Sequence, residues 1–343
     1  MELIKRWLRV LYWGGEVTLG FLIFLISNKT PPRAHQRMIG LYCLTGGYSN
    51  DFLSWAIGLF ERPYDFSNAS GILGNMGDKK RRDPVVSALR ERGYYVFENR
   101  VPEDLCNQLL HFATSHPCKT RRMDGDPLGK PVAAIYRRRA PQAVHYDFDT
   151  QDLLDNRDVQ RILADVSFAA VAQDYLGTRP VADVLSMWWH TDFSDKPDSE
   201  AAQYYHFDMD RPKWLKYFIY LTDVKTTNGP HSFVAGSHKS GRMPPSLLRK
   251  GYARLSDEEV GREFDGKDII EFAAPRGTII VEDTRGLHKG KLVEEGDRLM
   301  LQIQFSNSLF GGFYPKRSLG NDLCTDLEKS VEQFPGLYAA YLG

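Results

Sequence analysis

The chain has 343 residues, 42% of them apolar, and its 44 lysines and arginines balance its 44 aspartates and glutamates. This length and apolar fraction are enough for a substantial core, and the zero net charge excludes an overall field that would recruit nucleic acid or an anionic membrane. The four cysteines contain no C-x-x-C pair, which argues against a structural zinc site or a disulfide scaffold and favours the reducing cytoplasm.

We interpret residues 1–80 as an N-terminal appendage. Its apolar run 17–27, VTLGFLIFLIS, carries no charge, and no small-residue cleavage site follows it. These eleven residues are too few to span a bilayer, and extension towards the N-terminus crosses Glu16. We therefore expect a helix that packs against the protein. A peripheral membrane contact through residues 17–27, and thus a membrane-associated cytoplasmic protein, is the alternative.

The next elements are marked by helix and strand signals. A charged link at 78–83 precedes a short helix that begins near Val86 and ends at Gly93. The sequence YYVFEN then alternates like a strand, and Pro102 with two acidic residues after it opens a second helix. A further amphipathic stretch covers residues 151–176.

From residue 180 onward the sequence pattern becomes typical of β-strands. Short apolar or alternating runs recur there, and glycine and proline turns separate them. No helical pattern follows each strand. The sequence therefore predicts a mainly β fold with flanking helices, built on a jelly roll or barrel rather than on a doubly wound sheet.

Three histidine–aspartate pairs have a spacing of two: HYD at 145–147, HTD at 190–192 and HFD at 206–208. On a strand, both side chains of such a pair project from one face and can bind one metal ion, but about one pair is expected by chance. Only HFD has strand-like sequence on both sides. We therefore select His206 and Asp208 as metal ligands, and assign the other two pairs to the surface or to supporting roles.

A mononuclear metal site needs a third ligand from elsewhere in the chain. His288 ends a strand that leads into a turn, whereas His231 and His238 flank a tight connection and are expected to be structural. Ten residues later, Arg298 opens the strand RLMLQIQF on its polar face, where a cation needs an anion and a guanidinium suits a carboxylate. Two histidines and one carboxylate on one face of a metal are diagnostic of non-haem Fe(II) oxygenases.

The combination of HFD, NGP…AGSHK and LHKG, with Arg298 after it, resembles the phytanoyl-CoA dioxygenase family of Fe(II)- and 2-oxoglutarate-dependent oxygenases. The stretch LRERGYYVFENRVPEDLCNQL resembles the start of that family's domain. The resemblance covers roughly residues 84–310. It implies a double-stranded β-helix as the core of an oxygenase domain at 81–343.

The resemblance also implies roles for single residues. It implies three catalytic iron ligands: His206, Asp208 and His288. Arg298 would bind the 5-carboxylate of 2-oxoglutarate, and Phe218 or Tyr220 would wall the co-substrate pocket. Gln203 is a further family-like position, but strict strand alternation turns it away from His206 unless a bulge intervenes.

The activity that the resemblance implies uses Fe(II), 2-oxoglutarate and O₂ to hydroxylate a small-molecule or lipid-like substrate, with release of succinate and CO₂. Halogenating relatives need the carboxylate ligand replaced, so the presence of Asp208 favours hydroxylation. Two alternatives are a catalytically inactive jelly-roll binding module, which usually loses one of the four critical residues, and a cupin-like metalloenzyme with another reaction, which has no need of Arg298. The sequence defines neither the substrate nor the oligomeric state.

Overall fold

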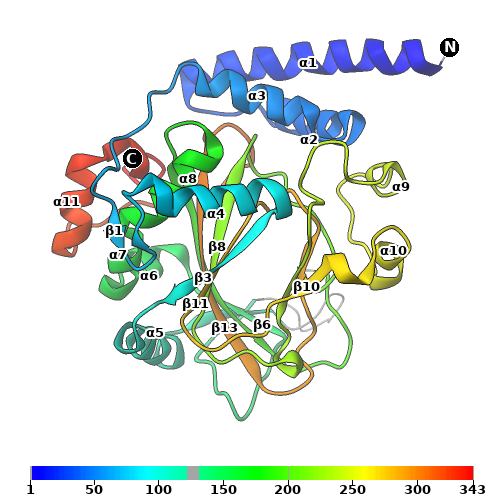
Figure 1. Cartoon of the computed structure of the whole chain (residues 1–343). Coiled ribbons are helices and arrows are strands. Elements are labelled where there is room, and N and C mark those ends of the chain that lie inside the picture. Colours follow the sequence, from blue (N-terminus) through cyan, green and yellow to red (C-terminus); the bar gives the residue numbers. More distant parts are fainter. Residues whose placement is uncertain (1, 122–130, 200, 343) are drawn as a thin grey trace.

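The computed structural model describes residues 2–121, 131–199 and 201–342, which fold into two facing antiparallel sheets with helices outside them (Figure 1). The strands of the large sheet are β3 (Tyr94–Arg100), β4 (Cys118–Arg121), β5 (Ala133–Ala134), β6 (His145–Asp147), β7 (Val181–Thr191), β8 (Trp214–Tyr220), β11 (Thr278–Glu282) and β13 (Asp297–Ser306). The small sheet contains β9 (His231–Val234), β10 (Ile269–Glu271) and β12 (His288–Gly290), and a hairpin joins β1 (Ser70–Gly71) to β2 (Gly74–Asn75). The strand orders are β3-β11-β8-β13-β7-β6-β4-β5 and β10-β9-β12.

The large sheet separates two apolar regions, because successive side chains of a strand point to opposite faces. On β13, Leu299 and Leu301 belong to the main core with the helices, whereas Met300 belongs to a smaller cluster with Phe233 of the small sheet. The two faces that the sequence predicts for this strand are therefore present. The prediction of a mainly β, jelly-roll fold is confirmed.

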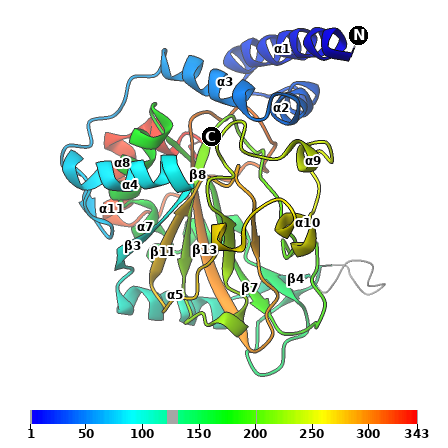
Figure 2. The ribbon, with the colours of Figure 1, turned by 45° about the vertical axis from the view of Figure 1, so that its right-hand side comes forward.

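Helices cover the outer face of the large sheet (Figures 1 and 2). They are α4 (Lys79–Arg92), α5 (Glu103–Ser115), α6 (Thr150–Asp155), α7 (Arg157–Leu163), α8 (Val166–Leu176) and α11 (Thr325–Gln333). Two short helices, α9 (Pro245–Leu248) and α10 (Asp257–Gly261), lie on the side of the small sheet.

Helix α4 begins earlier than the sequence predicts. The expected link at 78–83 is its first turn, because the Asp78 carboxylate accepts a hydrogen bond from the Lys80 amide at 2.9 Å and caps the helix. Pro84 lies inside the helix, in its second turn, where the missing N–H removes one backbone hydrogen bond. The predicted stop is present: Gly93 has a φ of 89° and closes the helix.

The N-terminal residues form three helices, α1 (Glu2–Ser27), α2 (Pro32–Thr45) and α3 (Tyr48–Gly58), in a layer at one end of the β-core (Figures 1 and 2). The expectation of a helix too short to span a bilayer is wrong. Within the described residues, the segment Ile4–Ser27 is long and apolar enough to do so by length and composition. Glu16 lies within this helix, and Arg33 and Arg37 neutralise its charge, since both pair with the carboxylate at 2.6 Å.

Helix α2 connects this layer to the segment that carries two of the predicted ligands. The ring of Tyr42 lies 5.4 Å from that of Phe207, and His35 Nε2 lies 3.0 Å from the Met209 carbonyl oxygen. The appendage therefore contacts both neighbours of Asp208. The division of the chain into residues 1–80 and 81–343 stays a prediction.

Candidate metal centre

Backbone pairing brings the predicted histidines together from distant parts of the chain. The amides of His206 and His288 donate to each other's carbonyl oxygens at 3.0 and 2.9 Å, in an antiparallel bridge. Their ring centroids lie 4.3 Å apart. The amide of Asp208 donates to the Thr284 carbonyl oxygen at 2.8 Å, which fixes the third side chain beside them.

The hydrogen bonds of the two imidazoles leave one nitrogen of each free to bind a metal. His206 Nδ1 donates to the Tyr204 carbonyl oxygen and His288 Nδ1 to that of Gly286, both at 3.0 Å. A carbonyl only accepts, so each Nδ1 carries the proton and each Nε2 keeps its lone pair. Oxygens of Asp208 lie 3.7 and 3.5 Å from these Nε2 atoms, and one ligand atom of each residue lies within 4.8 Å of the others.

The electrostatics favour the charge states that metal ligands need. Burial holds the pKa of His206 well below its ordinary value and also lowers that of His288. Burial alone would raise the pKa of Asp208, but the ammonium of Lys216, whose Nζ donates to Oδ2 at 2.6 Å, holds it well below the usual range. Two neutral imidazoles and one carboxylate are the donors that first-row divalent metals accept.

Lys216 is a functional candidate that the sequence analysis did not single out. It lies on β8 and is buried, with a second carboxylate oxygen, from Asp210, at 3.4 Å. The signal for it was available, because it is the one charged residue within WLKYFIYL and a buried lysine needs an anionic partner.

Arg298 is buried on β13, in the strand next to β8, with a guanidinium that is only partly satisfied. Its Nη2 donates to His190 Nδ1 at 2.6 Å, whereas Nε and Nη1 find no hydrogen-bond partner among the described residues. Gly290 leaves room for this group, since a Cβ there would lie 2.7 Å from Nη2. A buried cation with two unpartnered N–H donors needs an anionic acceptor, which a carboxylate supplies.

A chain of hydrogen bonds continues from Arg298 across two further strands. His190 Nε2 and His145 Nδ1 lie 2.8 Å apart, and His145 Nε2 and Asp147 Oδ1 lie 2.7 Å apart. Arginine only donates, so His190 accepts at Nδ1 and must donate from Nε2. His145 then accepts at Nδ1 and donates to Asp147. Burial, with His145 nearby, holds the pKa of His190 well below its ordinary value, which agrees with a neutral ring.

These contacts show where the residues of the other two histidine–aspartate pairs, 145/147 and 190/192, lie. His145 and His190 are buried rather than on the surface, and both stand behind Arg298. Asp192 takes no part in the chain: it accepts from the Gly296 amide at 2.8 Å. The structure thus brings only the pair at 206 and 208 to His288.

The predicted pocket residues are buried near Arg298 or in the adjacent loop. Phe218 and Tyr220 lie on β8 within the cluster between the sheets, and the Tyr220 hydroxyl accepts from the His231 amide at 2.9 Å. Gln203 precedes the bridge at His206, in a turn where Ala202 has a φ of 56°. Its Oε1 accepts from the Asp198 amide at 2.7 Å, while its buried Nε2 has no partner among the described residues.

His231 forms a buried polar pair with Glu282, next to the metal cluster. Its Nε2 lies 2.9 Å from Glu282 Oε2, and its ring lies 5.6 Å from that of His288. Burial raises the pKa of Glu282 to about 8 and lowers that of His231 to about 3. A protonated carboxyl can then donate to the neutral imidazole.

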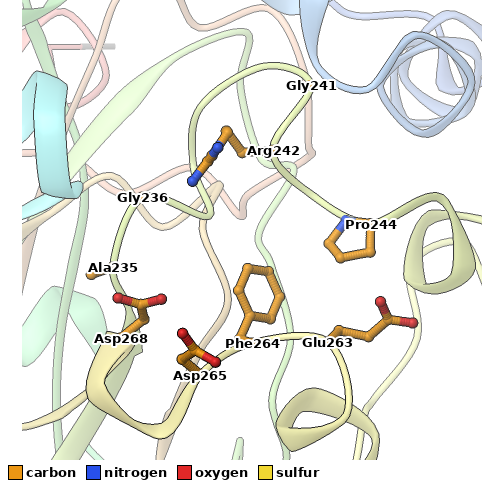
Figure 3. Close-up of a pocket in the computed structure, with 9 residues that line it drawn as sticks. All are labelled: Ala235, Gly236, Gly241, Arg242, Pro244, Glu263, Phe264, Asp265 and Asp268. Atoms are coloured by element: carbon orange, nitrogen blue, oxygen red, sulfur yellow. The ribbon is translucent and has the colours of Figure 1, made fainter.

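A separate surface pocket of about 380 Å³ lies between the segments 235–244 and 263–268 (Figure 3). Arg242 and three acidic residues line it, but Asp265 pairs with Lys267 at 3.1 Å and Glu263 accepts from Ser246. None of the residues that line this pocket belongs to the metal cluster. We therefore place the site at the cluster and not at this pocket.

Two histidines and an aspartate converge inside a jelly roll, with a half-satisfied arginine on a neighbouring strand, and could hold a single metal ion. The profile of the phytanoyl-CoA dioxygenase (PhyH) family matches residues 89–291, and the chain belongs to this family. The resemblance stated from the sequence is confirmed. Iron, 2-oxoglutarate and O₂ agree with this membership and with the donor set.

Comparison with other proteins adds structural neighbours. No curated protein matches the chain. The epimerase SnoN in complex with Fe3+, alpha ketoglutarate and nogalamycin RO is 16% identical, with a TM-score of 0.47 over 67% of this chain and 84% of that chain. EctD from S. alaskensis in its apoform is 19% identical (TM-score 0.45; 74% and 89% covered). HygX from Streptomyces hygroscopicus with nickel, 2-oxoglutarate and hygromycin B is 14% identical (TM-score 0.45; 68% and 90% covered).

Proposed function

We propose that this protein is an Fe(II)- and 2-oxoglutarate-dependent dioxygenase that hydroxylates a small-molecule or lipid-like substrate and releases succinate and CO₂. The observation that carries the proposal is the convergence of His206, Asp208 and His288, with both Nε2 atoms unprotonated and directed to one point. Membership of the phytanoyl-CoA dioxygenase family supports the reaction class.

His206, Asp208 and His288 would hold the ion and would leave coordination positions for co-substrates. Iron bound there supplies the redox chemistry that couples the oxidative decarboxylation of 2-oxoglutarate to the oxidation of a substrate C–H bond by O₂. The presence of Asp208, rather than a small residue that would admit a halide, favours hydroxylation as the outcome.

The protein's own residues hold the ligands and the co-substrate. The carbonyl oxygens of Tyr204 and Gly286 fix the tautomers of the two histidines, and Lys216 keeps Asp208 ionised. We assign Arg298 to the distal carboxylate of 2-oxoglutarate, since its Nε and Nη1 are buried and unpaired among the described residues. Phe218, Tyr220 and Gln203 are assigned to the wall of the same pocket.

The surroundings of the catalytic domain support a reducing compartment. All four cysteines, Cys43, Cys106, Cys118 and Cys324, are free thiols, as the cytoplasm permits. We therefore place the domain on the cytoplasmic side. The zero net charge of the chain supports a small-molecule substrate rather than nucleic acid.

Anaerobic titration of the purified protein with Fe(II) and 2-oxoglutarate tests the proposal, because chelation of iron by the 2-oxo acid produces a visible charge-transfer band. We expect the band in the native protein and in Arg262→Ala, a matched change of an exposed arginine. His288→Ala should lose both metal and band. Arg298→Ala should keep the metal but raise the Kd of 2-oxoglutarate by about 10- to 100-fold, the effect of losing charge-assisted hydrogen bonds.

The same titration distinguishes the alternatives. Metal that stays bound after His288→Ala would show that the ligand set is wrong. Equal 2-oxoglutarate affinity in Arg298→Ala would remove the co-substrate assignment and favour another metalloenzyme. A protein that binds both but releases no succinate across a panel of small-molecule and lipid substrates would be a binding module.

A further inference from the structure

Helix α1 exposes an apolar face along its whole length. Ten large apolar side chains point away from the protein and are each at least 42% exposed: Ile4, Trp7, Leu8, Leu11, Tyr12, Leu19, Leu22, Ile23, Leu25 and Ile26. Between residues 10 and 27 the only charged residue is Glu16, which Arg33 and Arg37 neutralise. Monomeric soluble proteins rarely expose a contiguous apolar surface of this extent.

Helix α3 and the residues after it extend this face. Tyr48, Phe52, Trp55 and Leu59 follow one another at spacings of four, three and four, all are exposed, and Phe60 beside them is 85% exposed. Fifteen of the 22 exposed large apolar side chains of the described residues therefore come from the first 60 residues. We call these fifteen side chains of α1, α3 and Leu59–Phe60 the N-terminal apolar face.

Part of this face, including Trp7, Tyr48 and Phe52, lines a concavity between the two helices. A groove of about 650 Å³ runs between them, with Trp7 and Val10 on one side, Phe52 on the other, and Met38 and Leu41 of α2 lining it. Figures 1 and 2 place α1 as the outermost element, so no other part of the described chain covers the face.

The opposite side of α1 is packed, which decides how the helix meets its partner. A Cβ on Gly20 would lie 2.2 Å from Ala34 Cβ, so the two helices are in close contact there. The rings of Phe21 and Phe24 lie 5.3 and 5.8 Å from that of Phe310. A perpendicular helix that crossed a bilayer alone would lose these contacts and would carry Glu16 into hydrocarbon.

We propose that the N-terminal apolar face docks the protein on a lipid bilayer, with α1 lying in the plane of the interface. The 24-residue apolar segment offers a contact about 36 Å long, and tryptophan and tyrosine are the side chains favoured at the headgroup level. Lys5, Arg9 and Lys29 are exposed at the two ends of the helix, where anionic headgroups would meet them.

Docking would fix the metal cluster over the membrane. Helix α2 supports α1 on one side and contacts Phe207 and Met209, the neighbours of Asp208, on the other. Delivery of an apolar substrate from the bilayer follows only if the proposed oxygenase function holds. The docking itself stands on the exposed surface alone.

Co-sedimentation of the full chain with phosphatidylcholine vesicles, with and without phosphatidylserine, tests the proposal. The double variants Leu11→Glu/Leu22→Glu and Phe52→Glu/Trp55→Glu place charges on α1 or on α3. The matched control, Val132→Glu/Ile135→Glu, changes exposed apolar residues beside β5, away from the face. We expect native protein and control to pellet with both vesicle types, somewhat more with phosphatidylserine, and each face variant to bind at least about tenfold more weakly.

Each other outcome contradicts the proposal. Native protein that stays in the supernatant, or face variants that bind as well as native protein, would overturn it. A dimer in sedimentation without lipid that both face variants dissociate, together with no vesicle binding, would assign the face to a second copy of the chain. Circular dichroism and the Fe(II)–2-oxoglutarate titration, unchanged in the face variants, separate lost docking from lost folding or a failed oxygenase assignment.

Discussion

The protonation states of His206, Asp208 and His288 determine what the metal cluster can bind. Two backbone carbonyls hold the protons of His206 and His288 on Nδ1, and the Lys216 ammonium keeps Asp208 ionised. The ligand atoms are thus ready for a cation without any rearrangement of protons. Arg298 is prepared in the same way, because His190 occupies one end of its guanidinium and leaves two donors free.

Removing the acceptor behind Arg298 should weaken 2-oxoglutarate binding without affecting the metal. We expect His190→Phe to raise the Kd of 2-oxoglutarate about tenfold or more, the effect of releasing a charge-assisted hydrogen bond, with the affinity for Mn(II) alone unchanged. His190→Asn keeps an acceptor near the position of Nδ1 and should restore most of the affinity. Isothermal titration with each ligand provides both values, and equal losses in the two variants would contradict a role through Arg298.

At this scale the sequence could identify ligands but not their supports. The strands around HFD and the downstream histidine and arginine were visible in the pattern of residues. The contact of His145 with His190 depends on the pairing of β6 with β7 and of β7 with β13, which places His190 opposite Arg298. His190 and Arg298 are 108 residues apart. The register that pairs their strands is set by the whole fold and cannot be predicted from the local sequence around either residue.

At the scale of elements, close contact between α1 and α2 holds the N-terminal layer together. Val17 and Gly20 of α1 face Ala34 and Met38 of α2, and all four are buried. The sequence indicates the apolar run 17–27 but not the full helix, because Glu16 breaks the apolar pattern. The two arginines that neutralise Glu16 belong to the next helix, and a pattern within one segment does not reveal them.

A methyl group at this contact should loosen the layer. Gly20→Ala would bring Cβ atoms to 2.2 Å of each other, and we expect a loss of about 1–3 kcal/mol in the free energy of unfolding, as for other overpacked sites. Gly15→Ala meets nothing within 4 Å and should gain up to about 1 kcal/mol from helix propensity. Urea denaturation, together with hydrogen exchange of the α1 amides, measures the change in stability of each variant. Changes of the same sign in the two variants would contradict close packing of Gly20 against Ala34.

At the scale of the whole molecule, a buried ion pair of the β-core, Arg285 with Asp283, extends to the N-terminal layer through Asp51, whose side chain is exposed. Arg285 donates to Asp283 at 2.7 Å and to Asp51 of α3 at 2.8 Å, and the Tyr175 hydroxyl donates to Asp283 at 2.5 Å. Burial alone would raise the pKa of Asp283, but Arg285 lowers it to about 2. The folded state therefore holds this carboxylate ionised at a pH where the unfolded chain has taken up a proton.

Acid should weaken the fold in a defined window. Because the folded pKa lies below the ordinary value of 3.8, the stabilisation is present above about pH 4 and is lost as the pH falls towards 2, with a size on the order of 2 kcal/mol. Asp283→Asn should be destabilised at pH 7 and show a flatter decline between pH 4 and pH 2.5 than native protein. The control Asp322→Asn changes an exposed carboxylate and should leave the pH dependence of the free energy of unfolding, measured with urea, unchanged. If Asp283→Asn shows the same pH dependence as native protein, the stabilisation does not come from Asp283.

The central claim is that one metal ion binds between the segment 206–208 and strand β12, which an isolated bridge holds together. The most direct measurement is a crystal structure grown anaerobically with Mn(II), a redox-inactive substitute here, and 2-oxoglutarate, with anomalous diffraction collected at the manganese edge. We predict one peak within bonding distance of His206 Nε2, His288 Nε2 and an oxygen of Asp208, and a 2-oxoglutarate carboxylate on Arg298. A manganese peak at another position would contradict the claim. So would well-ordered side chains of His206, Asp208 and His288 with no manganese between them at a saturating concentration of the metal.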